Sequence, residues 1–243
     1  MIPRLAQDFR VIVPDLPLGS HELPMKPGTD LSPLGLAKII EAFLSELDVE
    51  DVTLVGNDTG GALCQLVAVN HPERLGRLVL TPCDAFENFP PAMFRPLLVA
   101  ARIPGAVYAI AQSLRPRPAR KLPFAYGWLA KRGIPDELTD AWMAPALRSR
   151  EIRRDAGAVL KGLDKSILIA ASARLGEFDK PVLLAWAPED RFFKLSYAER
   201  LLDAFADARL ERIEDSYTFV SIDQPQRTAE LIAAFAREPV PAR

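Results

Sequence analysis

Hydrophobic residues along the chain fall into short runs that alternate with longer segments of helical periodicity. The short runs predict buried strands at residues 9–13, 52–55, 78–80, 182–186 and 210–213. Apolar residues at helical spacing predict helices at residues 31–47, 61–70 and 196–205, the last of them capped by Ser196. Strands that alternate with helices are typical of an α/β domain, in which helices flank a mostly parallel sheet.

The alternation stops between residues 84 and 180, where helix-like segments are broken by prolines. We therefore expect an α/β core made of residues 1–84 and 180–243, with residues 85–179 inserted as a helical lid. Residues 89–135 carry eight basic side chains and no acidic one. This run is either a solvated face balanced by acids elsewhere, or an attractor for anionic substrates or an acidic partner surface.

Composition narrows the function classes. The 243 residues include 30 basic and 32 acidic ones, and the net charge of −2 argues against a nucleic-acid binder. No apolar run reaches the ~18 residues that cross a membrane, and no secretory leader is evident. Two cysteines make no disulfide framework, which favours a cytoplasmic protein. Neither a metal cluster nor a phosphate-binding loop is found, so no cofactor is expected.

The strongest local signal is the sequence LVGNDTGGA at residues 54–62, in which a strand runs through Gly-x-Asp-x-Gly into a helix. We expect Gly56 and Gly60 to leave room for this tight reversal, since neither has a Cβ atom. Asp58 at its apex is then placed at a helix N-terminus, where negative charge is stabilised. It is a candidate nucleophile, with a helix-capping aspartate as the alternative. Asn57 either hydrogen-bonds within the site or solvates the turn.

This arrangement resembles the nucleophile elbow of the α/β-hydrolase fold, and an aspartate apex is similar to the haloalkane dehalogenase and epoxide hydrolase branch. Three further segments match in order: DLPLGS at residues 15–20, HPERLGRLVL at 71–80 and LLAWAPED at 183–190. The resemblance implies Asp58 as the nucleophile, Asp190 as the acid or orienting carboxylate, and the Thr59 backbone N–H as an oxyanion donor. Asp84 is an alternative to Asp190 or a helix cap.

The resemblance also implies a histidine base after the last strand, where this chain has Thr218. Threonine does not exchange a proton near neutral pH as imidazole does. With no histidine between them, Asp58 and Asp190 are expected to influence each other's protonation. Only two histidines exist. His71 lies at the far end of the elbow helix, and His21 is a candidate surrogate base, with a merely solvated loop histidine as the alternative.

The resemblance also implies leading strands and a His-Gly-type loop that this sequence lacks, so either the true start is upstream, or the domain is pared down or completed by dimerisation. The expected fold is therefore an N-terminally incomplete α/β-hydrolase fold, with an exposed sheet edge through which a homodimer could form. Aromatic residues of the insertion line the substrate pocket or pack in its core: Phe124, Tyr126, Trp128 and Trp142. We expect a hydrolase for small apolar esters, alkyl halides or epoxides; the alternative is a catalytically impaired or non-catalytic ligand-binding protein.

Overall fold

Four parallel strands form the sheet of the computed structural model, which describes residues 1–239. They lie in the order β1 (Val52–Asp58), β2 (Leu75–Cys83), β3 (Val182–Trp186) and β4 (Ala208–Arg212). Every neighbouring pair is parallel, and Val55, Val79 and Leu183 stand side by side across the first three strands. Asp58, Asp84 and Asp190 therefore lie at or just beyond the carboxyl ends of adjacent strands, which is where ligands bind open α/β sheets.

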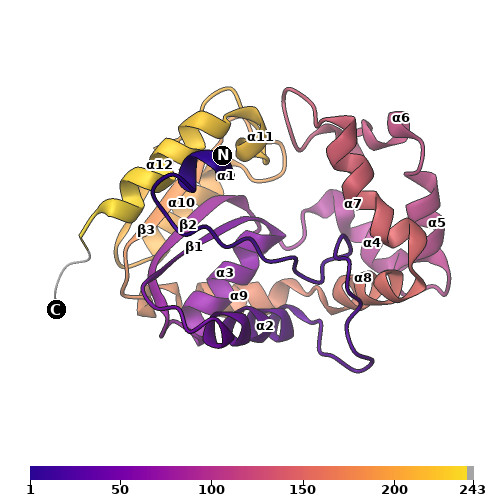
Figure 1. The fold of residues 1–243 in the computed structure, drawn as a ribbon, viewed down its shortest axis with the longest axis horizontal. Helices are drawn as coiled ribbons and strands as arrows, with labels where there is room; N and C mark the ends of the chain where they lie inside the picture. The colour runs from indigo at the N-terminus through magenta and orange to yellow at the C-terminus, as the bar shows by residue number, and fades with distance from the viewer. Residues whose placement is uncertain (240–243) are drawn as a thin grey trace.

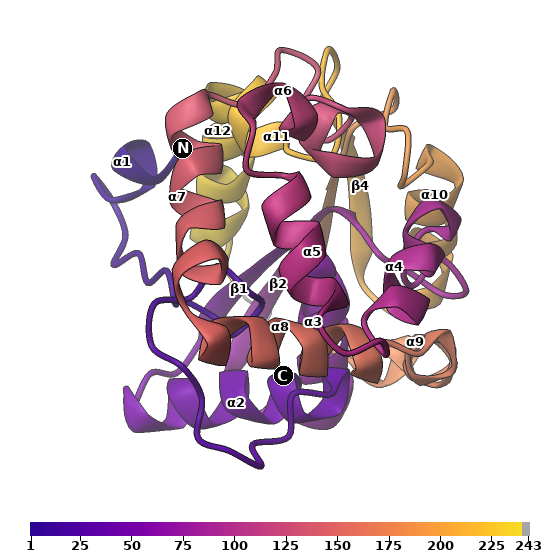
Figure 2. The same cartoon turned by 90° about the vertical axis from the view of Figure 1, so that its right-hand side faces the viewer.

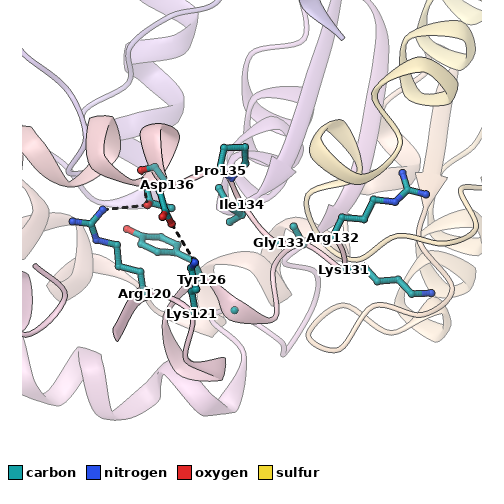
Figure 3. Close-up of a pocket in the computed structure, with 12 residues that line it drawn as sticks. Arg120, Lys121, Tyr126, Lys131, Arg132, Gly133, Ile134, Pro135 and Asp136 are labelled. Atoms are coloured by element: carbon teal, nitrogen blue, oxygen red, sulfur yellow. Dashed lines mark hydrogen bonds and ion pairs between the residues drawn. The ribbon is translucent and has the colours of Figure 1, made fainter. Parts of the chain in front are cut away.

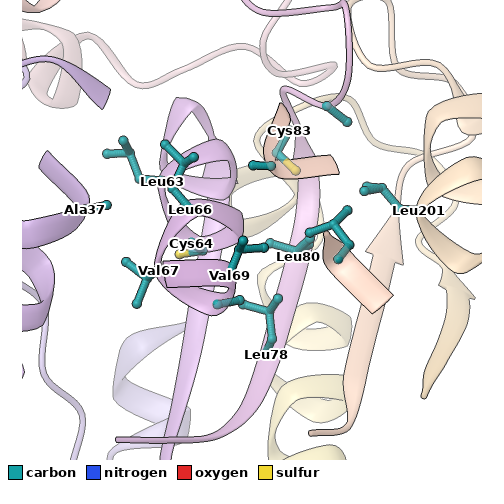
Figure 4. Close-up of a cluster of buried hydrophobic side chains, with 14 of the residues drawn as sticks. Ala37, Leu63, Cys64, Leu66, Val67, Val69, Leu78, Leu80, Cys83 and Leu201 are labelled. Atoms are coloured by element: carbon teal, nitrogen blue, oxygen red, sulfur yellow. The ribbon is translucent and has the colours of Figure 1, made fainter. Parts of the chain in front are cut away.

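Alternate residues of the two central strands bury themselves in two separate apolar clusters. Leu78, Leu80 and Leu184 join the cluster formed with α2 (Pro33–Glu46), α3 (Thr59–Asn70) and α10 (Leu195–Ala204). Figure 4 shows this cluster around α3. Val79 and Leu183 join the opposite cluster, with α12 (Pro225–Arg237) and the short α1 (Ile2–Leu5). Helices thus cover both faces of the sheet, as the alternating sequence predicted.

Residues between β2 and β3 form the insertion, and helices make up most of it. They are α4 (Arg95–Ala100), α5 (Ala106–Ser113), α6 (Arg117–Arg120), α7 (Asp136–Arg148), α8 (Arg150–Gly162) and α9 (Lys165–Ser172), with short turns at η1 (Ala92–Phe94), η2 (Pro123–Gly127) and η3 (Leu175–Glu177). Figures 1 and 2 show α4 to α8 gathered beside the sheet, while α9 returns along α3.

The strand predicted at residues 9–13 is wrong. Phe9 and Val11 do face the α12 cluster, but Ile12 and Val13 are exposed, and the segment has no strand partner within residues 1–239. An apolar alternation becomes a strand only where another strand supplies the ladder of hydrogen bonds. β1 is consequently an edge strand, with Val55 40% exposed.

Two helix starts differ in how they are capped. Ser32 caps α2 by accepting a hydrogen bond from the Gly35 N–H at 3.2 Å. Ser196 does not cap α10, because that helix begins at Leu195 and its N-cap, Lys194, makes no side-chain bond. The last helices are α11 (Val220–Asp223) and α12. No helix in the described part of the chain is long and apolar enough to cross a bilayer.

Candidate active site

The reversal at Asp58 is built by glycines, but not by the pair that the sequence suggested. A Cβ atom on Gly56 would lie 2.7 Å from both Cys64 Sγ and Gly61 Cα, and one on Gly61 would lie 2.3 Å from Cys83 Cβ. A Cβ on Gly60 would meet nothing within 4 Å, so the expectation that Gly60 relieves crowding is wrong. The helix that follows Asp58 thus packs Gly61, and not Gly60, against β2.

Asp58 ends β1 and is the N-cap of α3, so strand and helix meet at one residue. Its backbone lies at φ 54° and ψ −132°, a conformation that costs a side-chain-bearing residue of order 1–3 kcal/mol. Its side chain makes no cap hydrogen bond, which argues against the helix-capping alternative. Burial raises the pKa of Asp58 to about 6, the Thr59 N–H opposes this, and the charge of Asp190 adds to it.

Asp190 follows β3, and its carboxyl group is held in place through one of its two oxygens. Oδ1 accepts hydrogen bonds from the Phe192 and Phe193 N–H groups, both at 2.7 Å. Oδ2 is buried and has no hydrogen-bond partner among the described residues. Burial raises the pKa of Asp190 to about 6, against the opposing effects of the Phe193 N–H and of the Thr218 hydroxyl.

Thr218, at the predicted base position, is completely buried beside Asp190. Its hydroxyl is close enough to lower the pKa of Asp190, yet Oγ1 is not aligned for a hydrogen bond with any described group. The amide of Asn57 donates to the Thr218 carbonyl at 2.8 Å and to the Pro82 carbonyl at 2.9 Å. Asn57, which precedes Asp58, therefore links the end of β1 to the Thr218 segment and to β2.

Asp84 lies on the other side of the reversal. Its Oδ2 accepts a hydrogen bond from the Thr59 hydroxyl at 3.3 Å, and its Oδ1 is buried without a partner in residues 1–239. Burial and the charge of Asp58 raise its pKa well above the ordinary range. Gln65, which the sequence analysis missed, donates to the Asp84 carbonyl at 2.8 Å. A polar residue inside the apolar run of α3 was the available signal.

Three carboxyl groups thus lie at the carboxyl ends of β1, β2 and β3, and each has a raised pKa. Desolvation is the largest cause for each. The charge of one carboxylate disfavours ionisation of its neighbour, which favours keeping a proton within the group. The described residues contain no group of three or more His, Cys, Asp or Glu that could hold a metal ion. Such a site offers both a carboxylate and a neutral carboxylic acid.

His21 is buried and both of its ring nitrogens are engaged. Nδ1 accepts a hydrogen bond from the Gly19 N–H at 3.2 Å, and Nε2 lies 3.3 Å from Asp155 Oδ2 on α8. This makes Nε2 the protonated nitrogen. Asp155 also accepts from the Met25 N–H at 2.8 Å. His21 therefore holds the loop after residue 15 against the insertion and has no nitrogen free to take a proton from water.

A pocket of about 570 Å³ lies in the insertion and does not include Asp58. Figure 3 shows Arg120 and Lys121 on one side of it and Lys131 on the other. Each of these cations has an acidic partner: Arg120 pairs with Asp140, Lys121 with Asp136, and Lys131 with Glu189 and Asp215. Acids elsewhere balance these charges of the basic run, which supports the solvated-face interpretation.

Aromatic residues join the insertion to the core. Ring centroids lie 5.8 Å apart for Tyr126 and Trp142, and 5.9 Å apart for Trp142 and Phe219, next to Thr218. Trp128 packs on Phe192 at 6.1 Å. Tyr126 lines the pocket but points its hydroxyl at Met143 Sδ, 3.3 Å away. Phe124 is 60% exposed.

Comparison with known proteins finds similarity to proteins described as hydrolases. Residues 1–225 match a family model described as the alpha/beta hydrolase fold. A 2-hydroxy-6-oxo-6-phenylhexa-2,4-dienoate hydrolase of Burkholderia cepacia is 27% identical over 86% of this chain and 70% of that protein. A 2-hydroxy-6-oxononadienedioate/2-hydroxy-6-oxononatrienedioate hydrolase of Cupriavidus pinatubonensis is 26% identical over 86% of this chain and 69% of that protein.

Solved structures show the same fold. The 2-hydroxy-6-oxo-6-phenylhexa-2,4-dienoate hydrolase of a Rhodococcus strain superposes with a TM-score of 0.77 at 21% identity, covering 98% of this chain and 83% of that one. A protein described as an ancestral haloalkane dehalogenase superposes with a TM-score of 0.70 at 20% identity, covering 89% and 78%.

Proposed function

The chain belongs to the α/β hydrolase fold family, and on this premise we propose that it is a hydrolase that attacks its substrate with the Asp58 carboxylate. The substrate is a small apolar ester, alkyl halide or epoxide. Asp58 Oδ attacks the electrophilic carbon, the leaving group departs with the bonding electrons, and an ester or anhydride of Asp58 remains. The Thr59 N–H then donates to the oxygen that becomes negative when water attacks this intermediate.

One observation carries the proposal: Asp58 occupies the strained apex between β1 and α3 without capping the helix. Strain at a residue that serves no structural bond is typical of a functional position. Its pKa of about 6 leaves the carboxyl mostly ionised at neutral pH and more basic than an ordinary aspartate. The similar proteins include hydrolases of small molecules, which supports a hydrolase, and they specify neither the nucleophile nor the substrate.

A second candidate function is ligand binding without turnover, and Thr218 is the observation that favours it. Both histidines are away from the proposed chemistry, since His21 is bonded to Asp155 and His71 ends α3. A protein that forms the Asp58 ester but does not hydrolyse it would be consumed in one reaction, and one that forms no ester would only bind.

Intact-mass measurement after incubation with alkyl halides, epoxides and aryl esters tests the proposal. We expect an adduct that maps to Asp58 or multiple turnovers, and neither in Asp58→Asn. Asp51→Asn is the matched control, because Asp51 is another aspartate with positive φ, at the other end of β1. Ligand binding with neither adduct nor turnover would support the binding protein.

A further inference from the structure

Four buried side-chain oxygens lack hydrogen-bond partners among the described residues: Gln65 Oε1, Asp84 Oδ1, Asp190 Oδ2 and Thr218 Oγ1. The last two belong to the segments that follow β3 and β4, and the Thr218 hydroxyl is close enough to Asp190 to lower its pKa. A buried polar atom left unpaired costs about 1–3 kcal/mol. Folded proteins rarely accept this, and they commonly satisfy such atoms with an ordered water. Two orphaned atoms from neighbouring side chains supply the two polar partners that a buried water needs.

The surroundings fix where these atoms point. The Phe192 and Phe193 N–H groups hold Asp190 by Oδ1 alone, so its other oxygen faces away from the loop that anchors it. Asn57 holds the Thr218 backbone next to the Asp58 reversal. Asp190 is also near enough to Asp58 for its charge to act there. The two orphaned atoms therefore belong to segments that are both linked to the Asp58 reversal.

We propose that Asp190 Oδ2 and Thr218 Oγ1 together hold the hydrolytic water, and that Asp190 itself is the general base for the second half-reaction. This inference rests on the proposed function, because it concerns the hydrolysis of the Asp58 ester. Thr218 does not replace a histidine as a base; its hydroxyl accepts one hydrogen of the water while the other points at Asp190.

The water oxygen forms a bond to Cγ of the Asp58 ester, and its proton passes to Asp190 Oδ2. The resulting oxyanion is stabilised by the Thr59 N–H. It collapses by breaking the bond between Cγ and the ester oxygen, which was an Asp58 Oδ before the first half-reaction and now leaves with the alkyl group. The departing alkoxide takes the proton from Asp190. The products are the alcohol, a free Asp58 carboxyl and the regenerated Asp190 carboxylate.

Burial makes Asp190 suited to this task. Its pKa of about 6 keeps most of it ionised at neutral pH and makes it a stronger base than a solvated aspartate. Asn at this position keeps the oxygen that accepts the two N–H bonds, so Asp190→Asn removes the base with little change in shape. Thr218→Val removes the hydroxyl and keeps the branched outline.

Quenched-flow intact-mass measurement separates the two half-reactions with an alkyl halide that reacts with the parent protein. We expect Asp190→Asn to form the adduct within a few-fold of the parental rate and to hydrolyse it at least ~100-fold more slowly. Thr218→Val is expected to slow hydrolysis about 10-fold. Reaction in ¹⁸O-water should leave the label in Asp58 of the parent after one turnover, because water attacks Cγ.

Two controls have matched chemistry. Glu189→Gln removes the neighbouring carboxylate, which pairs with Lys131 on the surface, and should change neither rate. Thr228→Val removes another buried threonine hydroxyl, on α12, and should lower stability without moving the ratio of the two rates.

The outcomes are distinguishable. An Asp190→Asn protein that hydrolyses its adduct at the parental rate overturns the role of Asp190 and leaves Asp58 as nucleophile. A parental adduct that is never hydrolysed also overturns this inference, while the first half-reaction stands. Absence of an adduct in every variant, without turnover by the parent, overturns the proposed function and the inference with it.

Discussion

Replacing Gly61 and Gly60 in turn by alanine should have opposite effects on stability, although the two residues are adjacent on α3. The new Cβ at Gly61 would lie 2.3 Å from Cys83 Cβ, whereas carbon atoms pack at about 3.5–4.0 Å. Since a Cβ position is fixed by the backbone, no rotamer relieves the overlap, and α3 must move away from β2.

Overpacking of this kind costs about 1–3 kcal/mol. Alanine in place of glycine in a helix returns at most about 1 kcal/mol, and less in the first turn. Gly61→Ala should therefore lower the free energy of unfolding by up to about 2 kcal/mol. At Gly60 the Cβ would meet nothing within 4 Å, so only the gain of up to about 1 kcal/mol remains.

Urea unfolding followed by circular dichroism gives both free energies, with equal m-values showing that the unfolded state has not changed. The structure predicts a separation of about 1–3 kcal/mol between the variants. Equal stabilities, or a less stable Gly60→Ala, would refute the assignment of Gly61 as the residue that sets the approach of α3 to β2.

Three further predictions follow from the site, the insertion and the sheet edge. Burial raises the pKa of Asp190 to about 6, so the contribution of Asp190 to native stability falls as pH rises from about 4 to 6. Asp190→Asn should therefore exceed the parent by up to about 3 kcal/mol at pH 7 and match it below pH 4 in urea titrations. His21→Ala should lower the free energy of unfolding by about 1–3 kcal/mol in thermal unfolding, and this loss should not add to that of Asp155→Asn because the two residues share one hydrogen bond. The same variant should hydrolyse the adduct at the parental rate; a selective loss of hydrolysis would support His21 as a base. If β1 pairs with a second copy, sedimentation should show a dimer that Val55→Lys converts to monomer, and a monomeric parent would contradict this pairing.

Most of the core could be predicted from periodicity, because alternation and helical spacing are local properties of the chain. The parallel strands β1, β2 and β3 and the helices α2 and α3 were found in this way. The segment at residues 9–13 has the same apolar pattern but no neighbouring strand, and pattern alone does not report a missing partner. The resemblance singled out Asp58, Asp190 and Thr218 as the residues at the nucleophile, acid and base positions, and their roles remain proposals.

Contacts between segments far apart in the chain could not be predicted from the sequence. Spacing indicated which glycines flank Asp58, but the crowding of Gly61 depends on Cys83, which the register of β2 brings opposite. The pairing of His21 with Asp155 joins residues 134 positions apart. Gln65 and the two orphaned oxygens became visible only when buried groups could be matched with their hydrogen-bond partners.

Within residues 1–239, the strand that carries Asp58 is hydrogen-bonded to a neighbouring strand on one side only. Amide hydrogen exchange should therefore be faster in β1 than in β2 and β3, because an edge strand can open without disrupting the rest of the sheet. The position of the nucleophile is then maintained chiefly by α3, the β2 ladder and the Asn57 amide. A ligand that bonds to Asp58 would make opening of this strand less favourable. Slower amide exchange across residues 52–58 would therefore report occupancy of the site even when no product is released.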